Sequence, residues 1–265
     1  MIYDCFLYNG ESDLLQIRID EFNRLSPLKL TMPVTHIMIE GTYTFTGIRK
    51  SEAEMSDIPD VFWAQTKNIN WFIYDKVASD PWKNEEGQRN MIKEVLEKQF
   101  KPEDNDIIII SDVDEIPRAY AVQHYRPEFG LCSLQMNQYY YYLNCLAERN
   151  GWILPKIMPW SYLKDTTPDQ VRRSGFNLCM WQAGWHYSYM GGVGEILRKF
   201  KSFSHQEPEI QALADQRILE NKLAKLESLW ATNKLNLVDI EDAPFFVQQK
   251  RDRFKHMIYA GEVPK

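Results

Sequence analysis

The chain has 265 residues, of which 44% are hydrophobic, which is enough for a sizeable core in one large α/β domain or two small ones. Its formal net charge of −6 argues against bulk binding of nucleic acid, which normally requires a basic face. The four cysteines are widely spaced and form no CxxC pair, so reduced thiols are expected rather than a disulfide scaffold or a zinc site.

The start of the chain shows no targeting pattern. No basic segment followed by an apolar one opens the sequence, and no apolar stretch approaches the roughly 18 residues of a membrane span. If the first methionine is the native start, the sequence therefore predicts a cytoplasmic protein without a transmembrane segment.

The first 115 residues alternate predicted strands and helices. Strands are expected at 2–7, 34–39 and 71–74, and amphipathic helices at 14–25 and 86–100. This alternation predicts an α/β fold with a mostly parallel central sheet and right-handed crossovers. Neither GxGxxG nor GxxxxGK[ST] is present, which disfavours dinucleotide enzymes and P-loop NTPases.

A run of four isoleucines, 107–110, predicts a strand buried on both faces. The run leads into Asp112-Val-Asp114, and Pro117 then prevents simple continuation as strand or helix. In open α/β sheets, ligands bind beyond the carboxyl ends of the strands. Two carboxylates there favour a hard cation, Mn²⁺ or Mg²⁺, that carries a phosphate.

The second half is less regular and rich in aromatic residues. Strand structure is expected at 131–142 and 176–189, with a loop-like stretch at 150–175 between them. The glycines at 191–194 indicate a flexible loop, and the apolar spacing over 209–230 predicts one long helix. No repeat, low-complexity segment or linker marks a domain boundary.

Several chemistries use an Asp-x-Asp pair. A calcium loop of the EF-hand type is excluded, because Pro117 stands where that loop needs glycine. A phosphohydrolase of the haloacid-dehalogenase type also places such a pair after a buried strand, but near its first strand. A nucleotide-sugar transferase uses the pair to hold a divalent metal that bridges a diphosphate. The alternative without function is a loop of solvated carboxylates, and a non-catalytic carbohydrate-binding protein also remains open.

Several separate blocks in the same order resemble one family. The segment Asp112-Val-Asp-Glu-Ile-Pro-Arg118 resembles the signature of glycosyltransferase family 17, which includes the β-1,4-mannosyl-glycoprotein N-acetylglucosaminyltransferase. Other similar blocks span roughly residues 1–210: Ile2–Phe6 with Asn9, Glu11 and Asp13–Leu15; Glu40 with Thr44–Gly47; Gln135–Asn137 with Tyr139–Tyr142; Gly184–Ser188; and Ser202–Glu207.

The resemblance implies a single GT-A-type, Rossmann-like domain over 1–265. In that domain, 1–118 would bind the nucleotide sugar, and 119–265 would bind the acceptor and include the C-terminal helix. It also implies a metal-dependent inverting transferase that moves GlcNAc or a related sugar from a UDP-sugar, UDP-GlcNAc above all, to a glycan hydroxyl. Animal members carry a membrane anchor and a luminal domain that this chain lacks, which leaves the acceptor open.

Candidate residues follow from position and chemistry together. The expected metal ligands are Asp112, Asp114 and His186, with His205 as second choice. The expected donor-binding residues are Asn9, Glu40, Arg89, Asp112 and Lys199.

Inverting transfer also needs a base, usually a carboxylate, and Glu207 and Glu195 are the candidates. Aromatic rings can stack on the apolar faces of sugars, so Tyr141, Trp152 and Trp181 are candidates for acceptor binding. Arg118, next to the aspartates, is expected to neutralise them.

Overall fold

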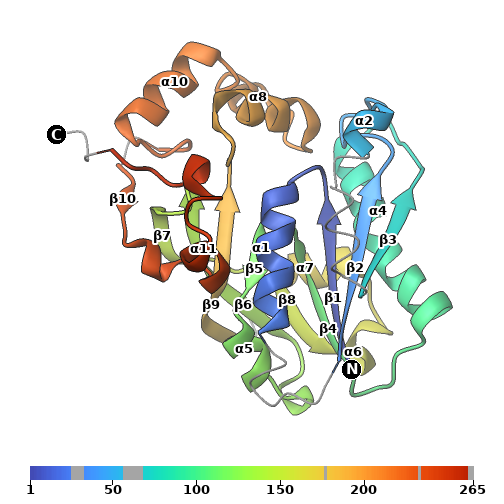
Figure 1. Cartoon of the computed structure of the whole chain (residues 1–265). Coiled ribbons are helices and arrows are strands. Elements are labelled where there is room, and N and C mark those ends of the chain that lie inside the picture. The colour runs from blue at the N-terminus through green and yellow to red at the C-terminus, as the bar shows by residue number, and fades with distance from the viewer. Residues whose placement is uncertain (25–32, 56–67, 176–177, 232–233, 262–265) are drawn as a thin grey trace.

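One mixed β-sheet runs through the molecule and is covered by helices on both faces (Figure 1). The computed structural model describes residues 1–24, 33–55, 68–175, 178–231 and 234–261. Within these residues, the strand order is β10-β7-β6-β8-β4-β1-β2-β3, and β9 pairs with both β6 and β5. The predicted α/β class with a mostly parallel central sheet is confirmed.

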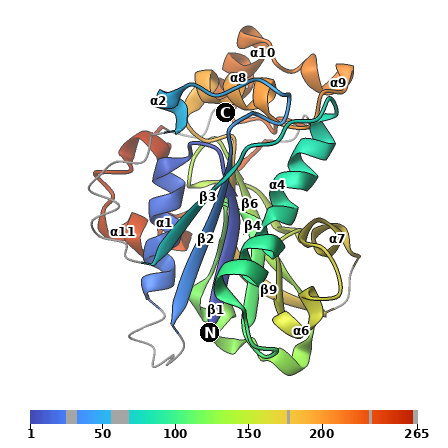
Figure 2. The same cartoon turned by 90° about the vertical axis from the view of Figure 1, so that its right-hand side faces the viewer.

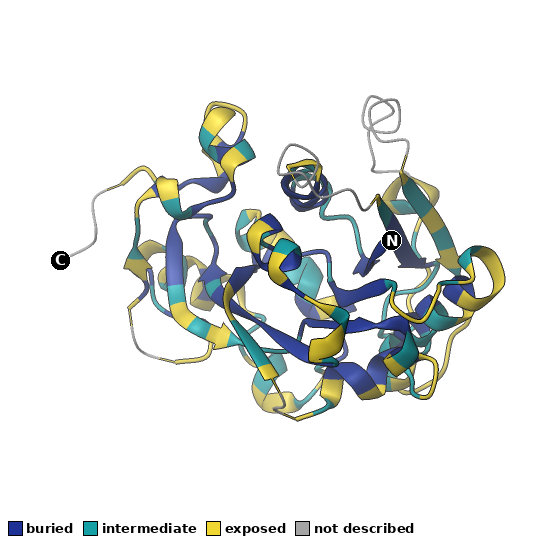
Figure 3. Ribbon diagram, turned by 90° about the horizontal axis from the view of Figure 1, so that it is seen from below, coloured by how far each residue is buried: buried dark blue, intermediate teal, exposed yellow. Residues whose placement is uncertain are grey.

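The parallel part of the sheet comes from the first half of the chain. Its strands are β1 (Ile2–Tyr8), β2 (Val34–Gly41), β3 (Ile69–Tyr74) and β4 (Ile107–Asp112). β1 lies between β2 and β4, with Cys5 opposite both Ile37 and Ile110. The isoleucines of β4 are at most 2% exposed, as expected for a strand covered on both faces. Figure 3 shows buried residues, in dark blue, running through the middle of the molecule. The carboxyl ends of these strands therefore meet at one edge of the sheet.

The second half of the chain extends the sheet in mixed orientation. Its strands are β5 (Glu115–Pro117), β6 (Cys132–Tyr140), β7 (Cys145–Trp152), β8 (Lys156–Pro159), β9 (Leu178–Ser188) and β10 (Asn236–Leu237). β8 joins the two halves, because it pairs antiparallel with both β4 and β6. β9 runs parallel to β6 and antiparallel to the short β5.

Helices cover the two faces and one end of the sheet (Figure 2). One face carries α1 (Ser12–Asn23) and α11 (Phe245–Gln249), and the other carries α4 (Pro81–Val95), α6 (Trp160–Leu163) and α7 (Pro168–Arg173). α2 (Glu52–Met55), α8 (Gly192–Ser202), α9 (Pro208–Gln211) and α10 (Gln216–Lys225) lie beyond the carboxyl ends of the parallel strands. The remaining helical segments are α5 (Ala119–His124), a π-helical turn at Leu96–Phe100 and 3₁₀ turns at Pro127–Phe129, Ile240–Asp242 and Lys255–Met257.

Two predictions in the second half of the chain, one of a helix and one of a loop, are wrong for local reasons. The expected long helix over 209–230 is broken, because Asp215 accepts from the N–H groups of Arg217 and Ile218 and starts a new helix. Leu226 then ends that helix with a φ of 50°. The expected flexible loop at 191–194 is instead the start of α8, where Gly191 supplies the left-handed conformation before the first turn.

Other boundaries differ less. The helix expected over 86–100 begins earlier, at Pro81, because Asp80 caps it by accepting from the N–H of Trp82. The stretch expected as loop at 150–175 contains β8, α6 and α7. Residues 25 and 176, at the ends of two expected elements, lie outside the described residues. No helix in the described segments has the length and apolar composition needed to cross a membrane.

Buried Arg18 ties α1 to the end of the central sheet. Its side chain is fully buried and forms a two-point ion pair with the buried Asp4 of β1. The same guanidinium donates to the backbone carbonyls of Asp112 and Glu115 over 3.0 and 2.7 Å. The loop that carries Asp114 is therefore held at both ends from inside the protein.

Gly184 is required where β9 packs against β5. A Cβ atom at this position would lie 2.3 Å from the carbonyl oxygen of Ile116. Gly184→Ala is therefore expected to lower the free energy of unfolding by about 1–3 kcal/mol, because backbone must move to accept the methyl group. Urea denaturation measures this loss. A Cβ on Gly175 would meet no atom within 4 Å, so Gly175→Ala is the matched control. Equal stability of the Gly184 variant and wild type would contradict this packing.

Candidate functional site

The loop between β4 and β5 places the two aspartates at the carboxyl edge of the parallel strands. Asp112 ends β4, and Glu115 begins β5. β5 pairs with β9 so that Glu115 lies opposite His186, and the N–H of Tyr187 donates to the carbonyl of Asp114 over 2.8 Å. This pairing brings His186, which is 72 residues further along the chain, next to Asp114.

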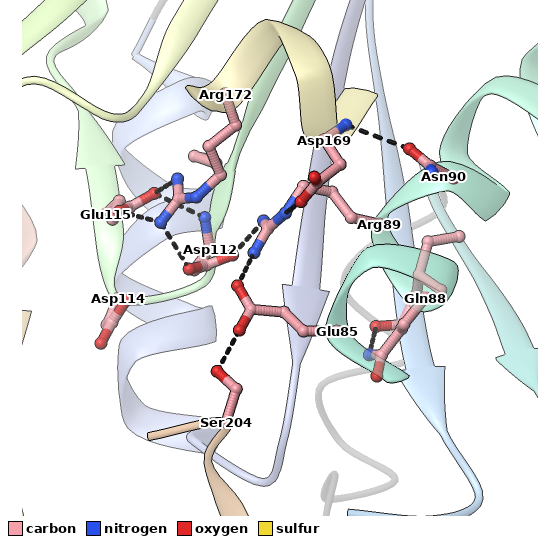
Figure 4. A network of polar contacts seen from close by, with 12 residues as sticks. Glu85, Gln88, Arg89, Asn90, Asp112, Asp114, Glu115, Asp169, Arg172 and Ser204 are labelled. Atoms are coloured by element: carbon pink, nitrogen blue, oxygen red, sulfur yellow. Dashed lines mark hydrogen bonds and ion pairs between the residues drawn. The ribbon is translucent and has the colours of Figure 1, made fainter. Parts of the chain in front are cut away.

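Asp112 is held by two buried arginines (Figure 4). Arg89 of α4 donates to Oδ1 over 2.6 Å, and Arg172 of α7 donates to Oδ2 over 2.7 Å. Arg172 also binds both oxygens of Glu115 over 2.8 Å, and the N–H of Asp112 donates to Glu115 over 2.7 Å. The side chains of Arg89 and Glu115 are at most 1% exposed, and that of Arg172 is 7% exposed. The first aspartate is thus part of a closed ionic network.

This network fixes the charge of Asp112. Burial by itself raises the pKa of its carboxyl group, but the positive charges of Arg172 and Arg89 hold that pKa well below its ordinary value. The carboxylates of Asp112 and Glu115 raise the pKa of the Arg172 guanidinium, although burial lowers it. Each oxygen of Asp112 accepts one charge-assisted hydrogen bond, so the two arginines fix the orientation of this carboxylate.

Asp114 has partners other than these arginines, namely Lys199 and His186. Lys199 of α8 donates to Oδ2 over 3.0 Å, and its ammonium group lies 5.2 Å from the ring centroid of Tyr189. Burial lowers the pKa of Lys199, and the charge of Asp114 outweighs this and raises it. His186 Nε2 lies 3.8 Å from the same oxygen, without a hydrogen bond between them.

Asp114 and His186 together fit a hard or borderline divalent cation. A carboxylate and an imidazole suit Mn²⁺, and such ions commonly take the rest of their ligands from water and substrate phosphates. Burial lowers the pKa of His186 in spite of the nearby Asp114, which favours the neutral ring that a ligand needs. Nδ1 of this ring is buried without a hydrogen-bond partner, whereas the side chain of Trp152 stacks on the ring at 4.2 Å. In the part of the chain that the structure describes, no group of three or more His, Cys, Asp or Glu side chains could hold a metal. Asp114 and His186 are thus the acidic and imidazole side chains that the structure brings together at this loop.

Two cavities meet at the aspartates. A cavity of about 100 Å³ lies over the ends of β1 and β2. A second cavity, of about 550 Å³, lies between α4, α7, α8 and β9. Both are lined by Phe45, Asp112, Asp114, Lys199 and Phe203. The smaller cavity is further lined by Tyr8, Asn9, Glu11, Tyr43, Lys50 and Gln88. The larger cavity has an aromatic wall of Trp82, Tyr140, Trp152, Tyr189 and Trp230. One edge of the sheet thus offers two adjoining spaces with charged groups between them.

Glu40 lies beneath the smaller cavity rather than in its wall. It is fully buried, and Lys50 donates to its Oε1 over 3.1 Å. Burial raises the pKa of Glu40 to about 7, although Lys50 lowers it. Lys50 itself lines the cavity, with 5% of its side chain exposed. Glu40 therefore holds Lys50 in place at the wall of this cavity.

The raised pKa of Glu40 predicts a pH dependence of stability. Above its ordinary pKa of 4.5, the unfolded chain loses this proton while the folded protein keeps it up to about pH 7. The contribution of Glu40 to the free energy of unfolding is therefore expected to fall by about 3 kcal/mol as the pH rises across this window. Glu40→Gln removes this titration. Urea denaturation of both proteins between pH 4.5 and 8 measures the difference, and a difference independent of pH would contradict the assignment.

The remaining candidates for donor binding and catalysis lie in different surroundings. Asn9 lines the smaller cavity, and its N–H donates to Glu11. Arg89 is fully buried between Asp112 and Glu85, so it orients the aspartate and does not reach the cavity surface. Glu195 is largely exposed and pairs with Arg198 on its own helix. Glu207 pairs with His205, at 3.4 Å, and His205 lines the larger cavity.

The three aromatic candidates for acceptor binding lie in three different surroundings. Trp152 lines the larger cavity. Tyr141 is 1% exposed, and its hydroxyl donates to the carbonyl of Glu227, so it belongs to the core. Trp181 is 69% exposed on β9 and lines neither of the two cavities. Arg118 does not neutralise the aspartates, because its guanidinium lies 3.9 Å from the ring centroid of Trp185 and pairs with Asp242.

Of the residues that join Asp112 in this ionic network, the sequence singled out Arg89 but not Arg172, Glu115 or Glu85. Arg172 follows a Thr-Pro-Asp helix start, which could have revealed α7 and its inward-facing side. Its partners lie 57 and 60 residues away, so no local pattern could have paired them.

Comparisons with known proteins found two distant structural similarities and one family match. The galactosyltransferase LgtC, in complex with donor and acceptor sugar analogs, is 9% identical with a TM-score of 0.34, over 83% of this chain and 82% of that chain. TarS of S. aureus is 12% identical with a TM-score of 0.35, over 97% of this chain and 50% of its own. A search of curated protein sequences found no match. The sequence model of glycosyltransferase family 17 matches residues 1–230. Since this match covers most of its 265 residues, the chain belongs to glycosyltransferase family 17.

Proposed function

We propose that this protein transfers a sugar from a nucleotide diphosphate donor to a hydroxyl group of a glycan, with inversion at the anomeric carbon. The observation that carries the proposal is the meeting of two cavities at Asp112, Asp114 and Lys199. A nucleotide sugar has a nucleoside and a sugar on opposite sides of a diphosphate. Two adjoining spaces with charged groups between them match that layout, and family membership gives the reaction class.

The smaller cavity is proposed to take the nucleoside. It lies beyond the ends of β1 and β2, where ligands of open α/β sheets bind. Tyr8, Tyr43 and Phe45 offer apolar faces to a base, while Asn9 and Lys50 offer hydrogen bonds. Uridine is the nucleoside that the family resemblance suggests, and UDP-GlcNAc is the proposed donor.

The larger cavity is proposed to take the donor sugar and the acceptor. Sugars present apolar C–H faces, which suit the aromatic wall formed by Trp82, Trp152 and Trp230. Gln138, Ser188 and Arg173 supply polar groups at the same surface. A cavity of about 550 Å³ lies within the range of ordinary ligand sites.

Asp114 and His186 are proposed to hold Mn²⁺ or Mg²⁺. When bound, the ion would neutralise charge that develops on the departing diphosphate. Lys199 already lies 3.0 Å from Asp114, so its ammonium group is placed to bind a phosphate oxygen at the same point. Asp112 is proposed to fix the position of the loop between β4 and β5 through its ion pairs with Arg89 and Arg172.

A phosphohydrolase with an aspartate nucleophile fits these contacts less well. Such an enzyme needs a carboxylate oxygen that is free to attack phosphorus. Both oxygens of Asp112 accept hydrogen bonds from arginine, and Asp114 Oδ2 accepts one from Lys199.

A thermal-shift panel of nucleotide sugars with Mn²⁺ tests the proposed function. A ligand at 100 times its dissociation constant stabilises the native state by about 2.7 kcal/mol, which raises the midpoint by roughly 5 °C or more for a chain of this size. UDP-GlcNAc is expected to give such a shift, and GDP- and ADP-sugars a smaller one. A panel in which no nucleotide sugar shifts the midpoint would contradict the proposal, and a shift by free glycans alone would indicate a carbohydrate-binding protein.

A further inference from the structure

His205 and Glu207 form a pair at the wall of the larger cavity. They lie in the segment between α8 and α9, and His205 Nδ1 is 3.4 Å from Glu207 Oε2. Both atoms are buried, and neither forms a hydrogen bond with the described residues, so the contact is an ion pair without hydrogen-bond geometry. The side chain of His205 is nevertheless 45% exposed and lines the cavity. One edge of the ring is therefore shielded against Glu207, while the rest of the ring is open.

The ring is also fixed by packing. It lies against Trp82 in an edge-to-face contact with 4.6 Å between the centroids, and Phe203 packs at 5.6 Å. A carboxylate near Nδ1 favours the tautomer with the proton on that nitrogen, in which Nε2 is the proton acceptor. This is the arrangement in which a histidine removes a proton from a hydroxyl group. The other charged side chains near the ring are Arg173, which lies over Trp82, and Glu85, which binds Ser204.

The carboxylates that line the same cavity are engaged by other groups. Among the described residues these are Glu85, Asp112, Asp114 and Asp169. Glu85 accepts from Arg89 and Ser204, and Asp169 accepts from Arg173 over 2.7 Å. Asp112 is held by two arginines, and Asp114 by Lys199. Each carboxylate is therefore a poorer proton acceptor than a histidine whose second nitrogen is open.

We propose that His205 is the catalytic base of the transfer reaction and that Glu207 is its positioning residue. This inference rests on the proposed function. His205 Nε2 takes the proton of the acceptor hydroxyl while the acceptor oxygen forms a bond to the anomeric carbon. The bond between that carbon and the diphosphate oxygen breaks, and its electron pair leaves with the nucleoside diphosphate. The imidazolium that forms is stabilised by the negative charge of Glu207.

The test compares His205→Ala with wild type, using UDP-GlcNAc with Mn²⁺ and either water or methyl glycosides as acceptors. The expected result is a fall of kcat for UDP release by about 10²–10⁴-fold, with an unchanged KM for the donor. Because the ring is partly exposed, added imidazole is expected to restore part of the lost rate. His124→Ala is the matched control, since His124 is exposed on α5, where its ring packs against Tyr120, and it lines neither of the two cavities.

Glu207→Gln separates positioning from a purely structural role. It keeps the side-chain size but removes the charge that stabilises the imidazolium. We expect a smaller loss of kcat than in His205→Ala, with the acidic limb of the pH–rate profile moved to lower pH. An unchanged pH–rate profile would contradict the role of Glu207.

Different results would contradict the assignment of His205 as the base and the proposed function. If wild type releases UDP and His205→Ala does so at the same rate, the base assignment is wrong and the proposed function stands. If wild type consumes no nucleotide sugar and binds none in the thermal-shift panel, both are wrong. A His205 variant that loses its rate, keeps the UDP-induced thermal shift and gains no rate from imidazole would also overturn the base assignment.

Discussion

Replacing Arg172 by methionine is expected to lower the free energy of unfolding by about 3–5 kcal/mol, the range for breaking a buried ion pair. Arg172 neutralises Asp112 and Glu115 at once, over 2.7 and 2.8 Å. The Glu115 side chain is 1% exposed, so without Arg172 its carboxyl group would be buried without a cationic partner. Trp152 would still donate to Glu115, but a neutral indole replaces little of a guanidinium's charge. Urea denaturation at pH 7 measures the effect.

The neighbouring Arg173 is the matched control for this change. Its side chain is 52% exposed and pairs with Asp169. Arg173→Met is therefore expected to cost no more than about 1 kcal/mol, because exposed ion pairs contribute little. If the Arg172 and Arg173 variants were equally stable, the ionic network around Asp112 would not have the role described here.

Replacing Asp114 by asparagine is expected to reduce UDP release from UDP-GlcNAc by roughly 10³-fold, because a bound metal supplies several kcal/mol of charge stabilisation in the transition state. His186→Ala is expected to have a similar effect. If both side chains hold the same ion, the double variant should lose little more than either single variant.

Activity and folding must be separated in this experiment. Asp114→Asn keeps the size of the side chain, and circular dichroism with urea denaturation checks that the fold persists. Asp104, which pairs with Lys164 at an exposed position, provides the control variant Asp104→Asn. Losses that simply add in the double variant would mean that Asp114 and His186 act separately.

The parallel strands could be predicted from the sequence, because a buried strand is a short, continuous run of apolar residues. Ile107–Ile110 is such a run, and its strand lies beside β1 in the centre of the sheet. α8 was missed because Gly191, Gly192 and Gly194 have the composition of a loop. In the structure, two of these glycines begin the helix, and Ile196 and Phe200, one turn apart, anchor it in the core.

The site was predicted in part, and the missing part is non-local. The two aspartates look equivalent in sequence, since both follow the same buried strand. The structure separates them, because Arg89 and Arg172 reach Asp112 from two helices, while Lys199 and His186 reach Asp114. These partners lie between 23 and 85 residues away along the chain, and only the packing of α4, α7, α8 and β9 brings them together.

UDP is expected to bind where Asp114 and His186 can share a metal with its diphosphate. Calorimetric titration of UDP into the wild-type protein, with Mn²⁺ and then with EDTA, tests it most directly. The affinity for UDP is expected to be roughly tenfold or more higher with Mn²⁺ than with EDTA, which corresponds to about 1.4 kcal/mol or more of binding free energy. Asp114→Ala is expected to abolish this difference. Equal affinity with and without Mn²⁺, in wild type and variant alike, would contradict it.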